Sequence, residues 1–187
     1  MTAEDTYKTI IEPSEGIYTE KRSKFIAIAL PVRTLDEIKI HLETYQKKYY
    51  DARHVCYAYM LGAARKDFRA NDNGEPSGTA GKPILGQINS NELTDILIIV
   101  VRYFGGIKLG AGGLIRAYSG SVAHAIEEIG RVEVKELTGL TVELTYSQYQ
   151  VFSNFLEKKR LQEFDTTFLS DVSTTLFVEE SEIERLG

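Results

Sequence analysis

The sequence predicts an α+β protein with two domains that meet near residue 130. Segments with strand and helix periodicity follow one another irregularly along its 187 residues. Of the 15 glycines, 11 lie between Gly62 and Gly120, which indicates functional loops in the middle of the chain. Residues 131–187 carry 6 basic and 11 acidic side chains and account for the whole formal net charge of −5. We therefore expect one domain over residues 1–130 and a smaller, acidic domain over residues 131–187.

The larger domain is expected to begin with two strands over residues 16–32, joined by a charged turn at residues 20–24. Residues 25–30 are apolar on both faces, so the second strand should be covered on both sides. Thr34 and Glu37 have the spacing of a capping box, which predicts the start of a helix. The elements expected next are a helix over residues 35–49, a strand over 54–61, a polar loop over 62–79, a short helix over 82–88 and a buried strand over 94–103.

After the glycine-rich stretch at residues 105–113, apolar side chains at helical spacing predict a helix that ends at Gly130. They are Ile115, Tyr118, Val122, Ile126 and Ile129. In the smaller domain we expect a strand over residues 132–146, a helix opened by Ser147 and Gln150, and strands over 164–169 and 173–178. The helix should face inward through Val151, Phe152, Phe155 and Leu156. An acidic run after residue 178 predicts another helix, and because nothing fills the last edge of this β-α-β-β unit, we expect a missing C-terminal tail.

Composition narrows the class of protein. The single cysteine, Cys56, cannot form an internal disulfide and indicates a reducing compartment or an inert buried thiol. No apolar stretch approaches the roughly 18 residues of a membrane span, and the N-terminus lacks the pattern of a secretory signal. We therefore expect a soluble cytoplasmic protein without a membrane partner. A pI of about 5.3 argues against nonspecific coating of nucleic acids but leaves room for a local basic face.

The glycine-rich stretch between Arg102 and Arg116 predicts an anion site, because it runs from a buried strand into a helix N-terminus. It is no Walker loop, since Ala111 stands where the lysine is needed, and Ile115 breaks the dinucleotide fingerprint. The alternative is a tight turn that needs glycine for helix–strand packing. The presence of several glycines and three cations favours the anion-binding site over this turn. The residues predicted to bind RNA or phosphate are Arg53, His54, Lys82, Arg102, Gly105, Gly106, Lys108, Gly110, Gly112, Gly113 and Arg116.

The polar stretch at residues 68–83 is the second candidate, because long loops in compact domains are often functional. Its possible ligand-contacting side chains are Asp72, Asn73, Glu75 and Ser77. A plain surface loop with an Asn-Gly turn would look similar. Two carboxylates are too few to predict a metal site, so we expect no metal, no cofactor and no catalytic residue.

Other chemistry finds little support in the sequence. No serine-hydrolase, zinc-protease or two-cysteine motif is present, and the alternation around Cys56 favours a core thiol over a nucleophile. Four aromatic residues would stack nucleobases if they faced outward: Tyr57, Tyr59, Tyr103 and Phe104. Core packing is the preferred interpretation, for Tyr57 and Tyr59 at least.

Both loops resemble the signature of the IMPACT family, including its bacterial YigZ-type members. The matching segments are residues 81–85, Leu93, residues 99–110 (IVVRYFGGIKLG), residues 53–54, residues 72–78 and residues 112–113. The resemblance covers residues 16–130, and the remainder resembles the small C-terminal domain of the bacterial members. It implies an N-terminal left-handed β-α-β domain, similar to the second domain of a small-subunit ribosomal protein and to domain four of elongation factor G. It also implies a ferredoxin-like C-terminal α/β sandwich, incomplete in this sequence.

The resemblance leads to the main functional hypothesis, a non-catalytic translation-associated protein that contacts RNA or the ribosome through the glycine-rich basic loop. Eukaryotic relatives regulate translation by binding a regulator of a stress kinase, but the separate interaction domain they use is absent here. A small-molecule phosphate or nucleotide site, enzymatic or not, is the alternative, because residues 109–114 resemble the phosphate loop of the GHMP kinases without its serine-rich continuation. Binding of a protein partner alone is the third hypothesis.

Overall fold

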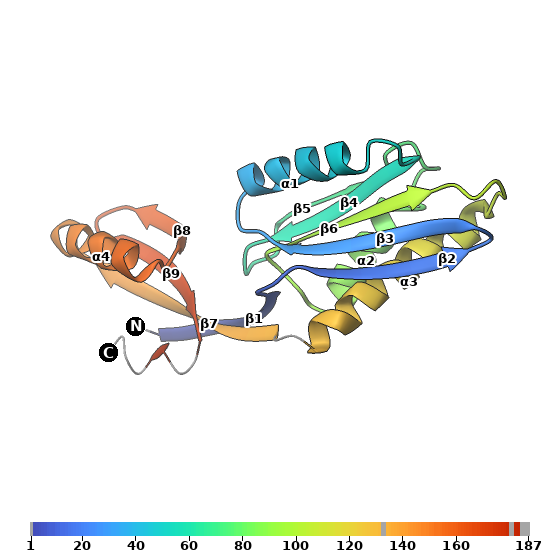
Figure 1. Ribbon diagram of the computed structural model, residues 1–187. Coiled ribbons are helices and arrows are strands. Elements are labelled where there is room, and N and C mark those ends of the chain that lie inside the picture. Colours follow the sequence, from blue (N-terminus) through green and yellow to red (C-terminus); the bar gives the residue numbers. More distant parts are fainter. Residues whose placement is uncertain (1, 132–133, 180–181, 184–187) are drawn as a thin grey trace. The chain divides into compact units, whose positions relative to one another are not determined.

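The computed structural model describes residues 2–131, 134–179 and 182–183 and divides the chain into two compact units (Figure 1). The N-terminal unit is Lys8–Val134, and the C-terminal unit combines Met1–Tyr7 with Lys135–Gly187. Each contains one sheet and its covering helices, which confirms the α+β class. The division differs from the expected one in the first seven residues, because the first strand, β1 (Thr2–Ile10), pairs in the C-terminal sheet.

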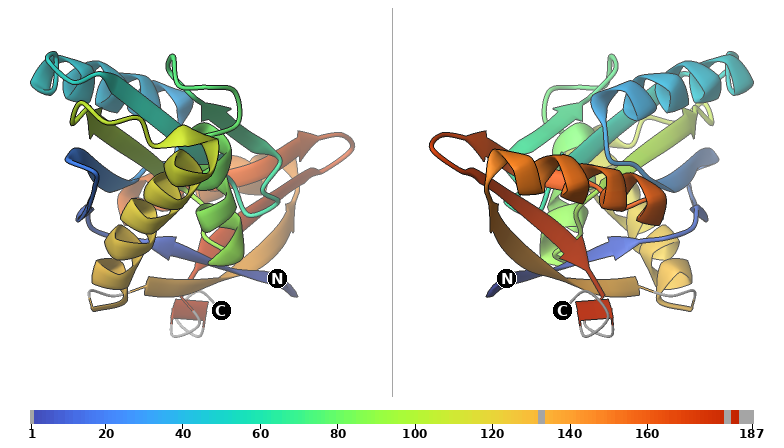
Figure 2. Two further views of the ribbon diagram at one scale, coloured as in Figure 1. Left: turned by 90° about the vertical axis from the view of Figure 1, so that its right-hand side faces the viewer. Right: turned by 90° about the vertical axis from the view of Figure 1, so that its left-hand side faces the viewer.

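The N-terminal unit has a five-stranded antiparallel sheet in the order β2-β3-β6-β4-β5. Its strands are β2 (Ser14–Glu20), β3 (Ser23–Pro31), β4 (His54–Leu61), β5 (Asp67–Asn71) and β6 (Ile96–Tyr103). Its helices are α1 (Leu35–Lys48), α2 (Gly81–Ser90) and α3 (Gly110–Arg131). Helix α1 lies on one face of the sheet, and α2 and α3 lie on the other (Figures 1 and 2).

The two-faced apolar pattern of β3 produces two cores, as the sequence predicts. Phe25, Ala27 and Ala29 are buried against α2 and α3 on one face of the sheet. The alternate residues of the strand, 26, 28 and 30, are buried against α1 on the other face. Strand β6 between β3 and β4 is buried in the same way, so the centre of this unit is a sheet covered on both sides.

Three local features of the N-terminal unit differ from expectation. Strand β5 lies inside the predicted polar loop; its residues are largely exposed and give no buried alternation, because it is an edge strand held by pairing with β4. Helix α3 begins at Gly110, within the glycine-rich stretch, and Leu114 rather than Ile115 faces the core; Ile115 is 42% exposed. Thr34 caps α1 by accepting from Glu37 N–H, but the Glu37 carboxylate accepts from Arg33 N–H, so the capping box is incomplete.

The C-terminal unit has a four-stranded sheet in the order β1-β7-β9-β8, with β7 (Val134–Leu144), β8 (Glu163–Phe168) and β9 (Val172–Val178). Helix α4 (Tyr146–Lys159) packs through Phe152, Phe155 and Leu156 onto Leu140 and Leu176. Strand β1 occupies the edge beside β7, so the edge expected to be empty is filled by the N-terminal strand. A sequence pattern does not reveal this pairing, because its partners lie more than a hundred residues apart.

Two further expectations for this unit are corrected. The capping box of α4 is formed by Thr145 and Gln148, two residues before the expected pair, since Thr145 is the residue with extended backbone. Val151 is 71% exposed rather than inward-facing. The acidic run after Val178 lies partly outside the described residues: Glu180 and Glu184 are not described. The finer likenesses, to a ribosomal-protein domain and to ferredoxin-like domains, stay predictions.

Candidate functional site

One end of the five-stranded sheet brings the two predicted loops together. The register places Lys24 of β3 opposite Tyr103 of β6, and His54 of β4 opposite Arg102. The β2–β3 turn, the residues before β4 and the loop after β6 therefore meet where β6 ends. We call this region, with its exposed cations Lys21, Arg22, Lys24, Arg53, Lys108 and Arg116, the basic end.

The Lys108 loop, residues 104–109, joins β6 to α3 and is fixed against the β2–β3 turn. Gly105 N–H donates to Ser23 Oγ at 3.2 Å, and a Cβ on Gly105 would lie 2.1 Å from the carbonyl carbon of Arg22. Gly106 and Gly110 have φ values of +88° and +73°, which other residues rarely adopt. Packing at Gly105 and backbone conformation at Gly106 and Gly110 thus require glycine, as the tight-turn interpretation predicts. A Cβ at Gly106 or Gly110 would meet no other atom, so the backbone there is also uncovered.

The start of α3 adds positive potential to this loop. Its first turn contains no acidic residue, and Gly110 and Gly112 are exposed while Gly113 is buried. Arg116 Nη1 lies 3.4 Å from the position of a Cβ on Gly112, so its guanidinium lies over the first turn. Helix N-termini attract anions through free N–H groups and the helix dipole. The helix start and the adjacent cations therefore act in the same direction.

Arg102 does not belong to the exposed cations, contrary to expectation. It is 5% exposed, and its Nη1 lies 2.5 Å from Glu75 Oε1 in a buried ion pair. Its guanidinium carbon lies 5.5 Å from the ring centre of Phe25 and 5.6 Å from that of Phe104. Arg102 Nε is buried without a hydrogen-bond partner among the described residues. The side chain points inward because it sits on the central strand, where a partner carboxylate compensates its charge.

The Asp72 loop, residues 72–80, uses its polar side chains to hold the protein together. The Asp72 carboxylate accepts from the N–H groups of Gly78 at 2.9 Å, Ala80 at 3.1 Å and Gly81 at 2.8 Å. It thereby caps α2, whose own N-cap residue, Ala80, has no side-chain acceptor. Burial alone would raise the pKa of Asp72, but these hydrogen bonds outweigh it and bring the pKa below its ordinary value.

Asn73 and Glu75 are likewise engaged. Asn73 Nδ2 donates to the Val55 carbonyl at 2.7 Å, and the Asn73 carbonyl accepts from His54 Nδ1 at 2.7 Å. Tyr118 donates to Glu75 Oε1 at 2.8 Å, and His54 Nε2 lies 3.6 Å from Glu75 Oε2. Of the four side chains expected to contact a ligand, Ser77 alone is exposed and makes no hydrogen bond to another described residue. Lys82 is exposed beside Gly78.

Cys56 lies behind this network as a buried thiol. It donates to the Asp72 carbonyl at 3.0 Å and lies 3.4 Å from the Tyr118 hydroxyl. Burial raises the pKa of the Cys56 thiol to about 12, so it stays protonated at neutral pH. Burial also raises the pKa of Tyr118. The prediction of a core thiol is confirmed, and so is core packing for Tyr57 and Tyr59.

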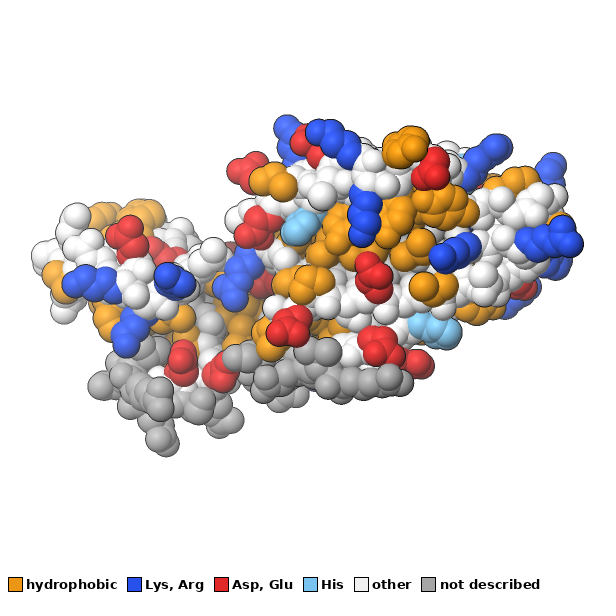
Figure 3. All heavy atoms as spheres, viewed as in Figure 1, with side chains coloured by type: hydrophobic (Ala, Val, Ile, Leu, Met, Phe, Trp, Pro, Cys, Tyr) orange, Lys and Arg blue, Asp and Glu red, His pale blue; other side chains and the backbone are white. Residues whose placement is uncertain are grey.

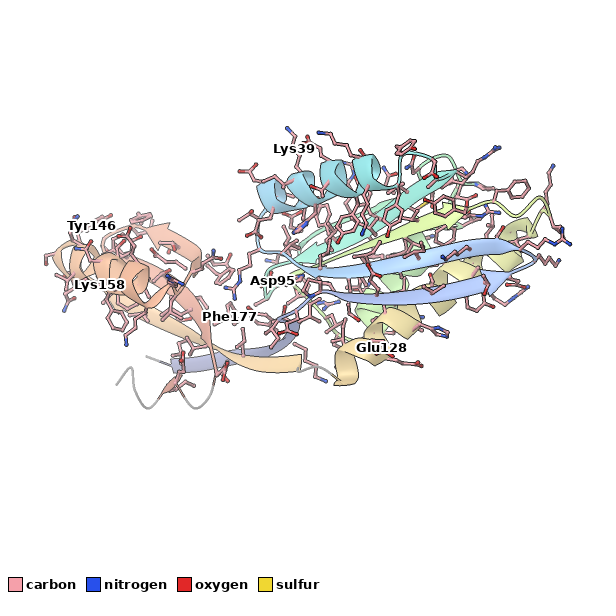
Figure 4. All side chains as sticks on the ribbon, viewed as in Figure 1. Lys39, Asp95, Glu128, Tyr146, Lys158 and Phe177 are labelled. Carbon is pink, nitrogen blue, oxygen red and sulfur yellow. The ribbon has the colours of Figure 1, made fainter. Side chains whose placement is uncertain are left out.

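Carboxylates are few at the basic end. Glu20 and Asp51 are the acidic residues closest to it along the strands, and each accepts from a tyrosine hydroxyl, of Tyr18 at 3.3 Å and Tyr103 at 2.9 Å. Asp95, just before β6, and Glu128, near the end of α3, belong to the opposite end (Figure 4). Lys and Arg side chains gather at the right-hand end of this unit in Figure 3. The surface there is positive although the chain as a whole is acidic.

Sequence reasoning missed Lys21, Arg22 and Lys24 as site residues. A charged run in a turn is ordinarily solvated surface, and only the pairing of β3 with β6 brings it to the Lys108 loop. Phe104 is one of the four aromatic residues expected to stack nucleobases if they faced outward. It is 43% exposed and lies beside Arg53, whose guanidinium carbon is 5.9 Å from the ring centre.

Residues 21–126 match the Impact N-terminal domain, and residues 142–187 match a domain of unknown function. The chain belongs to the IMPACT family. It is similar to the IMPACT family member YvyE of Bacillus subtilis, with 37% identity over 95% of this chain and 82% of the relative. It is 38% identical to the IMPACT family member YigZ of Escherichia coli over 68% of this chain and 64% of that protein. The predicted YigZ-type membership is therefore confirmed.

This IMPACT family chain is also similar to a solved structure. The crystal structure of a hypothetical protein covers 97% of this chain and 89% of its own, with a TM-score of 0.70 and 28% identity. Within the described residues, no helix is long and apolar enough to cross a membrane. The likeness therefore extends over both units, and the matched Impact N-terminal domain contains all six cations of the basic end.

The C-terminal unit of this IMPACT family chain has a feature of another kind. A mainly apolar groove of about 550 Å³ runs along α4. It is lined by Leu144, Val151, Phe152, Phe155 and Leu176 together with the polar Ser147 and Gln148. The exposure of Val151, which contradicts the inward position expected from sequence, arises because this residue stands on the rim of the groove. Among the described residues that line the groove none is charged, so its chemistry differs from that of the basic end.

Proposed function

We propose that this IMPACT family chain is a cytoplasmic, non-catalytic, translation-associated protein that contacts RNA or the ribosome through the basic end. The observation that carries the proposal is the gathering of six exposed cations beside the uncovered start of α3, in a protein whose net charge is −5. The likeness to ribosomal-protein and elongation-factor domains, implied by the sequence resemblance, is part of this proposal.

Electrostatics supports an anionic partner. Phosphates of a nucleic acid release bound counterions when lysine and arginine neutralise them, so a cluster of cations attracts a polyanion far better than a single phosphate. The Lys108 loop presents its cations from a backbone fixed by Gly105 and the β2–β3 turn. Little conformational entropy is then lost on binding. All six cations of the basic end belong to the N-terminal unit.

A non-catalytic role is supported by the state of the reactive groups behind the basic end. Cys56 is protonated, Glu75 is held by Arg102 and Tyr118, and Asp72 caps α2. A general base needs a lone pair within reach of a substrate, and a nucleophile needs an ionisable, accessible atom. These side chains are occupied by contacts within the protein instead.

The test is binding of a fluorescein-labelled RNA of about 12 nucleotides and of purified ribosomes, each at several salt concentrations. We expect the logarithm of the affinity to fall linearly with the logarithm of the salt concentration. For a single strand, each phosphate that the protein neutralises should add about −0.7 to the slope of this line. Lys108→Glu should weaken binding at least about tenfold, since it replaces attraction by repulsion. Lys39→Glu, the same charge change on the exposed surface of α1, is the matched control (Figure 4).

The outcomes separate the competing functions. No binding of either RNA or ribosomes would overturn the proposal. A salt-tolerant rise in melting temperature with one small phosphate compound, and none with RNA, would favour the small-molecule alternative, with Arg116 and the first turn of α3 as its site. A protein partner captured equally well by wild type and Lys108→Glu would favour protein binding alone.

A further inference from the structure

We propose that Phe104 and Arg53 form a stacking platform for an unpaired nucleobase, so that the partner of the basic end is single-stranded RNA. This inference rests on the proposed function and specifies its ligand. It begins from an exposed aromatic ring that the packing of the unit does not explain.

Phe104 directly follows the central strand β6, whose residues 96–102 are buried. Its ring is 43% exposed, whereas Phe25 on neighbouring β3 is fully buried. Leaving an apolar ring in water forgoes the free energy that burial would provide. A single exposed aromatic side chain is ordinary on a protein surface. What distinguishes Phe104 is that its surroundings are cationic and its position is fixed.

The ring is held in place from two directions. The guanidinium carbon of buried Arg102 lies 5.6 Å from its centre, and Arg102 is itself locked by Glu75. The next residue, Gly105, is pressed against the backbone of Arg22. A ring fixed in this way loses little freedom when a ligand stacks on it, which favours binding. A mobile ring on a flexible loop would not have this advantage.

Arg53 extends the platform. Its guanidinium carbon lies 5.9 Å from the ring centre of Phe104, and its backbone N–H donates to the Arg102 carbonyl at 2.9 Å. Among the described residues, no carboxylate forms an ion pair with Arg53. Nucleobases stack on phenylalanine rings and on planar guanidinium groups alike. Arg53 therefore offers both a stacking surface and a charge for the adjoining phosphate.

The flanking cations favour an RNA strand over a hydrophobic protein segment. Lys21, Arg22 and Lys108 belong to the same end of the sheet as Phe104, and each bears an exposed positive charge suited to backbone phosphates. In a duplex the faces of the bases are hidden in the stack, and an aromatic ring gains nothing from them. A platform beside a phosphate track is thus suited to unpaired bases.

The experiment compares a single-stranded oligouridylate of about 12 nucleotides with an RNA duplex of the same length. Phe104→Leu keeps an apolar side chain of similar size and removes the ring. It should weaken binding of the single strand at least about fivefold and leave binding of the duplex unchanged. Phe68→Leu is the matched control: Phe68 is 55% exposed, and its partner Met60 lies toward the other end of β4.

A direct optical signal comes from Phe104→Trp, because the chain contains no tryptophan. The indole retains the stacking surface, so the affinity for the single strand should be kept or increased. Its fluorescence should be quenched by the oligouridylate and not by the duplex. Phe68→Trp, carrying its only indole away from the platform, should show no quenching with either RNA. Unchanged melting temperatures verify that the variants fold.

Failure of the inference differs from failure of the proposed function. If Phe104→Leu binds the single strand as wild type does while Lys108→Glu binds it more weakly, the stacking inference is overturned and the proposal that RNA binds at the basic end is kept. Absence of binding by wild-type protein to the single strand, the duplex and ribosomes overturns both. Loss of a captured protein partner in Phe104→Leu, with RNA binding intact, would show that the ring serves protein docking and would overturn the inference.

Discussion

The Asp72 loop and the Lys108 loop lie at the same end of the sheet and differ in what their charged side chains contact. Each loop contains two glycines, and both lie where β4 begins and β6 ends. Asp72, Asn73 and Glu75 all bond to other parts of the protein. Lys108 and the start of α3 face solvent. The Asp72 loop holds the unit together, whereas the Lys108 loop leaves its cation exposed.

The contrast shows how a buried partner decides what a polar side chain does. Glu75 finds Arg102 on the central strand and Tyr118 on α3, so its charge is compensated internally. Lys108 has no carboxylate opposite it among the described residues, since the nearby acidic side chains accept from tyrosines. Substitutions in the two loops should therefore affect different properties: stability for the first and binding for the second.

The largest effect is expected from Glu75→Ala, which leaves the Arg102 guanidinium buried without its counter-charge. The free energy of unfolding should fall by about 3–5 kcal/mol, as measured by urea denaturation. The double variant Glu75→Leu with Arg102→Met removes both charges and should recover much of that loss. A loss below about 1 kcal/mol for Glu75→Ala would mean that the Glu75–Arg102 ion pair does not stabilise this loop.

Asp72→Asn should have an intermediate effect that depends on pH. The pKa of Asp72 is lowered in the folded protein, so its carboxylate stabilises the fold above the ordinary aspartate pKa. That contribution is lost as the pH falls through the lowered value. Near neutral pH we expect the variant to lose about 1–2 kcal/mol, because the charged cap of α2 becomes a neutral one.

Comparing wild type with Asp72→Asn at several pH values provides the control for this prediction. In urea denaturation at successive pH values, the stability difference between wild type and Asp72→Asn should shrink as the solution becomes strongly acidic. A difference that stays constant with pH would indicate that the carboxylate charge contributes nothing beyond its hydrogen bonds.

The smallest effects on stability are expected from Lys108→Ala and Ser77→Ala, one exposed side chain in each loop. Each should change the free energy of unfolding by less than about 0.5 kcal/mol, since neither side chain is buried. Only Lys108→Ala should weaken RNA binding. Equal weakening by Ser77→Ala would erase the functional distinction between the loops and extend the interface over both.

Much of the fold could be predicted from periodicity. The two-sided apolar pattern of β3, the boundaries of β4 and the position of α2 follow from local sequence, because burial of one or both faces fixes which residues are apolar. Strand β5 and the edge position of β1 did not follow, since an exposed edge strand has no buried face and pairing across the chain leaves no local pattern. The expectation that Ile115 and Val151 face inward was wrong for a related reason. The spacing of apolar residues does not determine which residue of a helical turn contacts the core.

For the candidate site, the sequence by itself determined the chemical inventory: a glycine-rich strand-to-helix loop with nearby cations, and a second loop with carboxylates. Tertiary structure decided which of these groups remain available. The register of β3, β4 and β6 brings Lys21 and Arg22 to the Lys108 loop and turns Arg102 inward toward Glu75. The physical reason is that a charge near a buried strand must be compensated by a partner from elsewhere in the chain, and only folding supplies that partner.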